Sequence, residues 1–417
     1  MGKFYDVDPK TCSLEELKTA IDKCKDSVEY YGSLEQGCKR FINSVYGALG
    51  SKYYSLSNTD IAESITTQGQ DLIKYSVRAF NLLIRSKWNT LTEYHKMIGD
   101  AMKEKFPDFD EERFLELCKK PVEFGETLQA YGDTDSAYIS VDPLIKTCGI
   151  TNEQATDFIL FFNKFLMSSY FDYCFNQYAE HYNCPVNLEN FELEKIARSL
   201  LMQKKKRYVM DIAWKEPDVH VKPLHSLLFK GVEVVKGTSS LYVRNEQREY
   251  ILWIMDCINK DIKIDYSKVV SKLKEMRQRF ILQDPNDICM NMSISNYDKY
   301  VYNDKGVSVV YNTGVVVPFQ AKAAARYNNM LYSPRFSKYR SKYQMIHSSD
   351  KIKLYYIKDG DGEAFAFLPN NFPMEFAPKI DMDKQFENLI LNPLNRYHEA
   401  LGLHIVNSNL TYSNPLW

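Results

Sequence analysis

Hydrophobic positions in the N-terminal half of the chain recur mostly at the spacing of a helix with one buried face. Serine or threonine followed three residues later by glutamate or glutamine marks the starts, because such a pair caps a helix N-terminus reciprocally. These capping pairs are Ser13 with Glu16, Ser33 with Gln36, and Thr151 with Gln154. The helices predicted are residues 14–29, 34–48, 58–86 and about 152–181, with Tyr31-Gly32 between the first two.

Shorter stretches alternate apolar and polar positions, which is typical of strands with one buried face. In the first half they predict a β-hairpin over residues 127–142 with its turn at 132–135, and strands near 192–194 and 207–210. Beyond Ser239 the predicted elements are helices over 249–262 and 266–282, strands at 307–311 and 314–319, a hairpin of 351–357 with 363–367, and a helix over 384–401. Separate runs of helices and antiparallel strands predict an α+β fold.

Composition limits the class of protein. The 417 residues suffice for two or three modules with a buried core. Because 53 basic residues nearly balance 54 acidic ones, any nucleic-acid contact must come from local patches. The nine cysteines include no Cys-x-x-Cys pair, which indicates a reducing compartment without a disulfide framework or zinc ribbon. No signal-peptide core or membrane-spanning apolar run is present in the sequence, so we expect a soluble cytoplasmic protein without membrane partners.

The turn of the predicted hairpin carries two carboxylates, Asp133 and Asp135, within Tyr131-Gly132-Asp133-Thr134-Asp135-Ser136. Like charges this close repel, so one takes up a proton unless a cation lies between them. Magnesium prefers carboxylates together with phosphate oxygens and water, and two such ions can activate a hydroxyl group and stabilise leaving pyrophosphate. The string therefore indicates two-metal phosphoryl chemistry. A solvated acidic turn is the alternative, and it is the commoner explanation of a bare Asp-x-Asp.

A helix face with nucleotide-binding chemistry precedes this hairpin. Lys39, Asn43 and Tyr46 are spaced i, i+4, i+7 and so share one face. Lysine would neutralise phosphate charge, asparagine would donate or accept a hydrogen bond, and the tyrosine ring would pack beside a base pair. Gly47 and Gly50 either allow the backbone to approach DNA or end the helix. An ordinary exposed helix face is the alternative.

Together, Lys39-x-x-x-Asn43-Ser44-x-Tyr46-Gly47 and the later carboxylate string resemble the fingers and palm motifs of the family B DNA polymerases. Residues 43–50, followed by Thr66-Thr67-Gln68-Gly69-Gln70, are especially similar to replicative polymerases of tailed phages. The resemblance implies DNA-directed DNA synthesis with two Mg²⁺ ions held mainly by Asp135 and Asp133. It implies that Lys39, Asn43 and Tyr46 bind the incoming dNTP, with primer–template DNA as the partner.

Further motifs follow in the family's order. Lys204-Lys205-Lys206-Arg207-Tyr208 resembles the motif that contacts the primer-terminal duplex, Glu194 resembles an acidic palm residue that helps to order the metals, and Lys230-Gly231-Val232-Glu233 resembles the end of the palm. The residues implied to contact DNA are Lys205, Lys206, Arg207, Tyr208, Lys230 and Gly47.

The resemblance also implies a partial right-hand layout. Residues 1–50 would be the second half of helical fingers, and residues 51–240 an antiparallel-sheet palm with an insertion at about 85–126. Residues 241–417 would form a mixed, mostly helical thumb and C-terminal tail. The charged stretch 87–123 is expected to be exposed.

The family pattern contains parts that this sequence lacks. A family B polymerase carries a proofreading exonuclease and a first palm motif, with another catalytic aspartate, ahead of the Lys39 helix. We therefore expect a C-terminal half that is active only with an N-terminal partner chain, as in a naturally split polymerase. A truncated gene product or a catalytically inactive primer–template-binding module is the alternative. The tail, residues 410–417, is a candidate for docking on a sliding clamp, and the phage resemblance implies the cytoplasm of an infected bacterial host.

A calcium-binding protein is a third reading, raised by Asp359-Gly360-Asp361-Gly362. The spacing fails the EF-hand pattern because Ala364 stands where glycine is required. A β-hairpin turn explains this sequence better.

Overall fold

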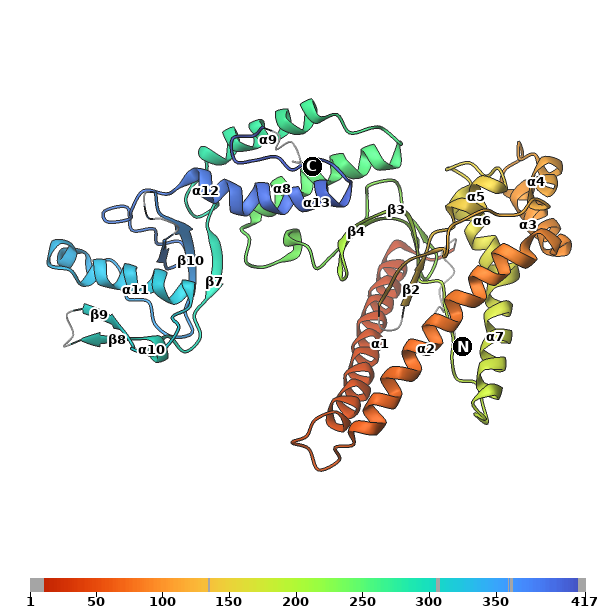
Figure 1. Ribbon diagram of the computed structural model, residues 1–417, viewed down its shortest axis with the longest axis horizontal. Helices are drawn as coiled ribbons and strands as arrows, with labels where there is room; N and C mark the ends of the chain where they lie inside the picture. The colour runs from red at the N-terminus through yellow and green to blue at the C-terminus, as the bar shows by residue number, and fades with distance from the viewer. Residues whose placement is uncertain (1–10, 134–135, 305–307, 359, 361–362, 412–417) are drawn as a thin grey trace. The chain divides into compact units, whose positions relative to one another are not determined.

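The computed structural model describes residues 11–133, 136–304, 308–358, 360 and 363–411. It divides into two compact units, one of residues 1–151 with 165–189 and the other of residues 152–164 with 190–417 (Figure 1). Helices and antiparallel sheets occur together, so the predicted α+β class is confirmed. Among the described residues, no helix is long and apolar enough to cross a membrane.

A single long helix, α1 (Leu14–Leu49), opens the first unit. The predicted capping box at its start is confirmed, since the Ser13 backbone N–H donates to the Glu16 carboxylate at 2.8 Å and the Glu16 N–H donates to Ser13 Oγ at 3.3 Å. The prediction of two helices separated at Tyr31-Gly32 is wrong. One interior glycine costs a helix only about 1 kcal/mol, and the helix-favouring sequence on both sides outweighs it. Ser33 therefore lies inside the helix and caps nothing.

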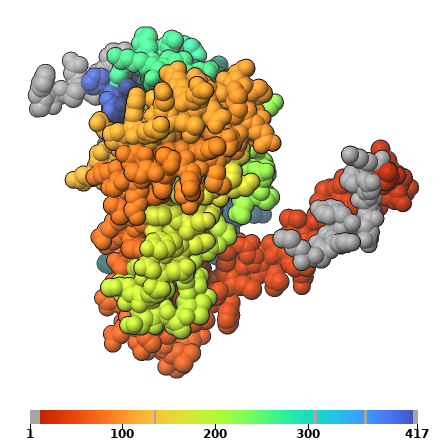
Figure 2. Space-filling view, turned by 90° about the vertical axis from the view of Figure 1, so that its right-hand side faces the viewer, coloured from red at the N-terminus to blue at the C-terminus, as the bar shows by residue number. Residues whose placement is uncertain are grey.

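No residue of α1 is buried. Leu14, Val28 and Phe41 are 71%, 74% and 72% exposed, although each is apolar. The N-terminal part of this helix is drawn in red in Figure 2. The C-terminal part meets α2 (Thr59–Leu82), where the hydroxyl groups of Tyr46 and Thr66 share a hydrogen bond of 2.9 Å.

Helix α2 packs on α7 (Ser168–His181) largely through tyrosines. The Tyr75 hydroxyl donates to the Cys174 carbonyl at 3.1 Å, and the Tyr170 hydroxyl donates to the Ala79 carbonyl at 3.1 Å. Helix α6 (Ala155–Phe162), the π-helical turn η3 (Asn163–Met167) and α7 make the predicted long helix, which is confirmed. The predicted cap at Thr151 is wrong, because the helix begins after Gln154 without a side-chain cap.

The expected insertion folds into a helical module. Its elements are the π-helical turn η1 (Leu83–Lys87), the 3₁₀ turn η2 (Trp88–Thr90), α3 (Thr92–Lys105) and α4 (Glu111–Cys118). Trp88, Ile98, Met102, Phe114 and Cys118 are each at most 2% exposed and form its interior. The charged residues cover a buried core, so the prediction of a simply exposed stretch is wrong.

The predicted carboxylate hairpin is confirmed as β1 (Gln129–Asp133) and β2 (Ser136–Ile139), paired antiparallel. The short helix α5 (Asp142–Thr147) follows it.

The second unit begins with an antiparallel sheet built around β4 (Arg207–Lys215). Strand β4 pairs with β3 (Lys195–Lys204), β5 (Val219–His220) and β6 (Leu227–Lys230). The strand predicted near 207–210 is confirmed and extends further. The strand predicted at 192–194 is wrong, since pairing starts only at Lys195. Ile159 and Leu160 of α6 pack on this sheet against Trp214.

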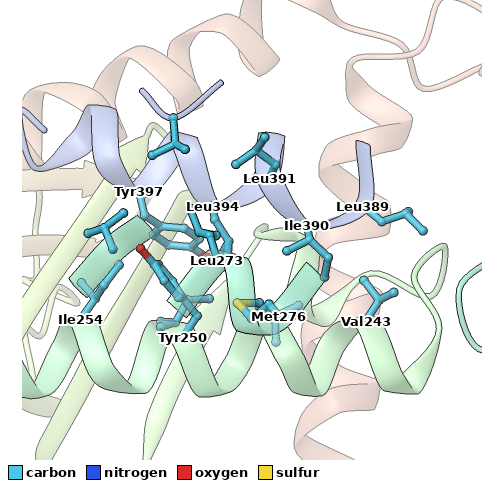
Figure 3. Packing of buried hydrophobic residues seen from close by; sticks show 14 of the residues in the cluster. Val243, Tyr250, Ile254, Leu273, Met276, Leu389, Ile390, Leu391, Leu394 and Tyr397 are labelled. Atoms are coloured by element: carbon cyan, nitrogen blue, oxygen red, sulfur yellow. The ribbon is translucent and has the colours of Figure 1, made fainter. Parts of the chain in front are cut away.

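Helices cover the next part of the unit. They are the 3₁₀ turn η4 (Glu233–Val235), α8 (Leu241–Asn259), α9 (Tyr266–Ile281), α12 (Met382–Phe386), the π-helical turn η6 (Glu387–Leu391) and α13 (Asn392–Ala400). Figure 3 shows their common core, in which Ile254 of α8, Leu273 of α9 and Leu394 of α13 face one another and are fully buried. The helices predicted at 249–262, 266–282 and 384–401 are confirmed, the first starting earlier.

A second core surrounds a three-stranded sheet of order β11-β10-β7, formed by β7 (Met290–Ser293), β10 (Lys351–Tyr356) and β11 (Ala364–Phe367). Helix α11 (Phe319–Tyr332) packs its alanines and Tyr327 on this sheet. The neighbouring elements are α10 (Tyr297–Tyr300), β8 (Val301–Asp304), β9 (Ser308–Tyr311) and the 3₁₀ turn η5 (Pro334–Tyr339).

Two sequence predictions in this region are confirmed and one is wrong. The strand at 307–311 corresponds to β9, and the hairpin of 351–357 with 363–367 corresponds to β10 and β11. The strand predicted at 314–319 is wrong, because the chain turns at Gly314 (φ +79°) and α11 starts at Phe319. Most of the turn raised for calcium, Asp359, Asp361 and Gly362, lies outside the described residues.

Candidate functional site

The acidic hairpin has a regular register. Tyr131 pairs with Tyr138, Gly132 with Ala137 and Asp133 with Ser136. The rings of Tyr131 and Tyr138 lie 5.3 Å apart, as expected for a cross-strand aromatic pair that stabilises a hairpin. Asp133 is thus the last residue of β1, where its half-buried side chain stands beside the turn. Asp135, the carboxylate that the sequence favours most, lies outside the described residues.

Residues at the end of α2 fix the base of this hairpin. The Asn81 side chain accepts a hydrogen bond from the Leu128 backbone N–H at 3.0 Å and donates to Thr127 Oγ1 at 3.0 Å. Nearby, the Arg85 guanidinium lies 4.4 Å from the centre of the Phe124 ring and donates to the Gly125 carbonyl. The two ends of the helical module therefore meet, and the module leaves the register of β1 undisturbed.

The hairpin residues are chemically suited to a hard divalent cation. Carboxylate oxygens are the protein ligands that Mg²⁺ prefers, and Asp133 presents one beside a turn rather than inside a core. Within the described ranges, no three His, Cys, Asp or Glu side chains gather where they could hold a metal. The donor type at the hairpin thus fits such an ion, and Asp133 is the described residue placed to hold it.

The predicted nucleotide-binding residues share one face of α1 near its C-terminal end. Lys39 Nζ lies 2.5 Å from Glu35 Oε1, and both side chains are about 60% exposed. Asn43 is also exposed, and Tyr46 is held by the hydrogen bond to Thr66. Since an exposed ion pair is worth at most about 1 kcal/mol, a phosphate group could replace Glu35 at little cost. Gly47 lies within the helix with nothing within 4 Å of an added Cβ, and of the two glycines predicted to end the helix it is Gly50 that does so.

Lysines gather at one end of the β3-β4-β6 sheet. Lys205 and Lys206 form the tight turn between β3 and β4, with Lys206 at φ +64°. Lys230 of β6 is paired across from Tyr208 of β4, so it stands at the same end. All three lysines are exposed, but the Tyr208 ring is buried at 5% exposure. The predicted DNA-binding lysines therefore lie together on the surface, whereas the side chain of Tyr208 is buried against the core.

Arg207, also predicted to contact DNA, is engaged by a carboxylate. Its guanidinium lies 3.6 Å from Glu233 Oε1, which also accepts from Lys236 Nζ at 3.1 Å and from Arg396 of α13. Burial disfavours the charged form of Glu233, but hydrogen bonds from Lys236 and Arg396 outweigh it and hold its pKa below the usual 4.5. Glu233 thus links β4, η4 and α13 directly beneath the lysine turn.

Gly231 adds a second constraint to this turn. Its φ is +62°, and a Cβ there would lie 2.2 Å from the Lys206 carbonyl oxygen. Only glycine can supply both the left-handed backbone and this close approach. The sequence contained the Lys230-Gly231-Val232-Glu233 string, but nothing in its local pattern shows that Glu233 would reach Arg207 and Arg396.

Glu194, proposed from the sequence as a third metal-binding carboxylate, precedes β3 in the second unit. Its carboxylate is 72% exposed and lies 2.9 Å from Lys195 Nζ. Asp133 belongs to the first unit. Sequence reasoning missed Asn81 and the contacts of Glu233 with Arg207 and Arg396, because these partners are distant in the sequence.

Comparisons with known proteins agree with these features. The family model for DNA polymerase family B matches residues 14–315, which include the α1 face, the acidic hairpin and the lysine turn. The DNA-directed DNA polymerase of Enterobacteria phage T4 is 24% identical over 413 residues, covering 93% of this chain and 39% of that protein. That of Escherichia phage RB69 is 28% identical over 228 residues, covering 51% of this chain and 21% of that protein.

A eukaryotic relative shows the same similarity. The DNA polymerase delta catalytic subunit of Dictyostelium discoideum is 25% identical over 276 residues, covering 63% of this chain and 20% of that protein. This chain therefore spans well under half the length of the relatives that it matches. The match over residues 14–315 confirms the resemblance found in the motifs: the chain belongs to DNA polymerase family B.

Proposed function

We propose that this chain supplies the metal-binding, nucleotide-binding and primer-binding residues of a DNA-directed DNA polymerase. The observation that carries the proposal is the antiparallel pairing of β1, which ends on Asp133, with β2, which begins at Ser136, within the region matched by the family. In the sequence Asp135 lies between these two residues. A turn with two carboxylates is favourable when divalent cations neutralise it. Primer–template DNA and dNTPs are then the substrates.

The hairpin would hold two Mg²⁺ ions through Asp135 and Asp133, with Glu194 as a supporting carboxylate. When bound, these ions would activate the primer 3′ hydroxyl group and neutralise charge on the leaving pyrophosphate. The cross-strand pair of Tyr131 and Tyr138 within the hairpin, and Asn81 at its base, would keep the carboxylates in position. Such positioning is a main source of catalysis in phosphoryl transfer.

The exposed face of α1 would receive the dNTP. Lys39 would exchange Glu35 for the triphosphate, Asn43 would hydrogen-bond the nucleotide, and the ring of Tyr46, fixed by Thr66, would pack beside the nascent base pair. Gly47, with open space around it, would let DNA approach the helix. Residues 1–50 would then act as the second half of the fingers.

The lysine turn would grip the primer-terminal duplex. Lys205, Lys206 and Lys230 are exposed at one end of the sheet and suit phosphate contacts, which position a duplex without reading its sequence. Arg207, through Glu233, and the buried Tyr208 would hold the turn in place and would also contact the DNA. In this proposal residues 51–240 are the palm, with the helical module as its insertion, and residues 241–417 are the thumb and tail.

Further parts of a polymerase would complete this site. The family pattern includes a proofreading exonuclease and a first palm motif with another metal-binding aspartate, which we propose act together with this chain. A separate N-terminal polypeptide that carries these parts stays a prediction. Docking of the C-terminal tail on a sliding clamp and function in the cytoplasm of a phage-infected bacterium also stay predictions. A catalytically inactive primer–template-binding module is the second candidate.

Primer extension separates these two candidates. The 417-residue chain is incubated with labelled primer–template, dNTPs and Mg²⁺, alone and with a second polypeptide carrying the first palm motif. The polymerase proposal predicts extension only in the second mixture. Duplex binding without extension in either mixture would favour the binding module, and extension by the chain alone would contradict the need for a partner.

A further inference from the structure

Two buried thiols lie next to each other in the first unit. Cys118 is the last residue of α4, and Cys148 comes directly after the last residue of α5. The Cys118 thiol donates a hydrogen bond to Cys148 Sγ at 3.5 Å, although 30 positions separate the two residues in the sequence. Both are free thiols, 0% and 1% exposed. The fold therefore brings together two sulfur atoms that no local sequence motif pairs.

The ends of the two short helices pack closely around this pair. Gly149, directly after Cys148, has φ +68°, and a Cβ there would lie 2.7 Å from Leu117 Cδ1, next to Cys118 in the chain. A disulfide bond requires its sulfur atoms at about 2.05 Å, so they would have to approach by about 1.5 Å. Because helix ends fray more readily than helix centres, a local adjustment at these ends can supply that movement.

The hydrogen bond makes the two thiols chemically unequal. Cys148 Sγ is the acceptor, and a Cys148 thiolate, the nucleophilic form of the side chain, would be stabilised by accepting it. The same hydrogen bond, together with burial, raises the pKa of the Cys118 thiol, which therefore keeps its proton. Cys148 is thus placed to react first with an oxidant, and Cys118 is the neighbouring thiol that can react with the product.

A small oxidant has a short path to these thiols. Lys119 follows Cys118, Gly149 follows Cys148, and both of these neighbouring residues are exposed. Opening the end of either short helix would therefore uncover a sulfur atom without unfolding the core of the unit. Hydrogen peroxide is small and uncharged, so such a limited opening is sufficient for it.

We propose that Cys118 and Cys148 are a peroxide-reactive thiol pair that closes reversibly into a disulfide bond. The Cys148 sulfur attacks one oxygen of hydrogen peroxide, the O–O bond breaks, and Cys148 becomes a sulfenic acid as one water molecule leaves. The Cys118 sulfur then attacks the Cys148 sulfur, and the S–S bond forms as the S–O bond breaks. A second water molecule leaves with the Cys118 proton. Two electrons thus pass from the two thiols to one peroxide molecule.

The disulfide bond would close a loop that contains the acidic hairpin. Strands β1 and β2 lie between Cys118 and Cys148 in the sequence, so the bond would join the two ends of the segment that carries Asp133. A cross-link stabilises a fold mainly by restricting its unfolded chain. In a reducing compartment the pair would stay as thiols and would close only under oxidation. This inference concerns stability and does not depend on the proposed function.

Peptide mapping tests whether the bond forms. The reduced full chain is treated with hydrogen peroxide at neutral pH, the remaining thiols are alkylated, and the protein is digested with trypsin without reduction. The disulfide should join the peptide of residues 114–119 to that of residues 147–164, each of which contains one cysteine. Dithiothreitol should separate the two peptides. Recovery of both cysteines in alkylated form, or of Cys148 only as a sulfinic acid, would overturn the proposal.

Thermal unfolding provides the second measurement. Peroxide should raise the unfolding midpoint by about 5–10 °C in the wild type and in Cys184→Ser, which removes an exposed thiol of the same unit. Cys118→Ser and Cys148→Ser should show no rise. The proposal fails if the wild type shows no rise, or if Cys118→Ser shows an equal one. It also fails if the bond forms as fast in urea, because the fold would not then be what pairs the sulfur atoms. The wild-type peptide map decides the question even where a serine variant does not fold.

Discussion

Glu233 is the single residue on which the geometry of the lysine turn depends most. It accepts from Lys236 and Arg396 and lies 3.6 Å from Arg207, so one carboxylate contacts three cations beside a turn that already carries exposed lysines. Removing that charge leaves Arg207 and Arg396 close together without a counterion. The Glu233 carboxylate is only 16% exposed, so water screens its attraction to these cations less than it would at the surface.

We predict that Glu233→Gln lowers the free energy of unfolding at neutral pH by about 2 kcal/mol, the typical contribution of hydrogen bonds to a charged group. Glu363→Gln is the matched control, since it removes one exposed partner of Arg326 and should cost less than about 1 kcal/mol. Urea unfolding of the three proteins measures the difference. Equal losses in the two variants would show that Glu233 has no special structural role.

The same residue predicts a pH dependence. The pKa of Glu233 is lower in the folded protein than its usual 4.5, so the carboxylate stabilises the fold above that pH. The contribution is lost as the pH falls through the folded-state pKa. The difference in unfolding free energy between wild type and Glu233→Gln should therefore shrink as the pH is lowered from about 7 to about 3. A difference that stays constant over this range would contradict the pKa assignment.

At the scale of elements, the hairpins and most helices follow from local patterns, because caps and apolar spacing act within a few residues. The Ser13 capping box and the alternation of residues 129–139 are examples. The failures have physical causes as well. Gly32 did not break α1, because the helix-favouring residues on both sides outweigh its cost. The charged residues 83–122 surround a buried core that depends on packing between helices, which the local sequence pattern does not show.

Gly231 offers a test of one such element. Gly231→Ala places a Cβ against the Lys206 carbonyl at a positive φ, so we expect a loss of at least about 1–3 kcal/mol and a distorted lysine turn. Gly237→Ala is the control, because nothing lies within 4 Å of its added Cβ and its φ is not in the left-handed region. Thermal unfolding and duplex affinity should both fall for the first variant. An unchanged affinity for Gly231→Ala would show that the turn does not grip DNA.

For the whole molecule, the family was predictable and the supporting contacts were not. The motifs that contain Lys39, Asp133 and Arg207 follow one another in the family's order, so the family could be recognised without a structure. Asn81 meeting Leu128, and Arg85 meeting Gly125, are contacts between residues some 40 or more positions apart that no periodicity encodes. These contacts explain how the acidic hairpin is held after the helical module that precedes it in the chain.

The central claim is that the Asp133–Asp135 hairpin carries nucleotidyl transfer, and primer extension with the partner polypeptide tests it most directly. Asp135→Asn is compared with Asp172→Asn, the same chemical change on the exposed side of α7. We predict that Asp135→Asn lowers the extension rate by more than about 100-fold, the upper range for changes around metal ligands, while duplex binding persists. Asp172→Asn should extend normally. Extension by Asp135→Asn at the wild-type rate would contradict the account.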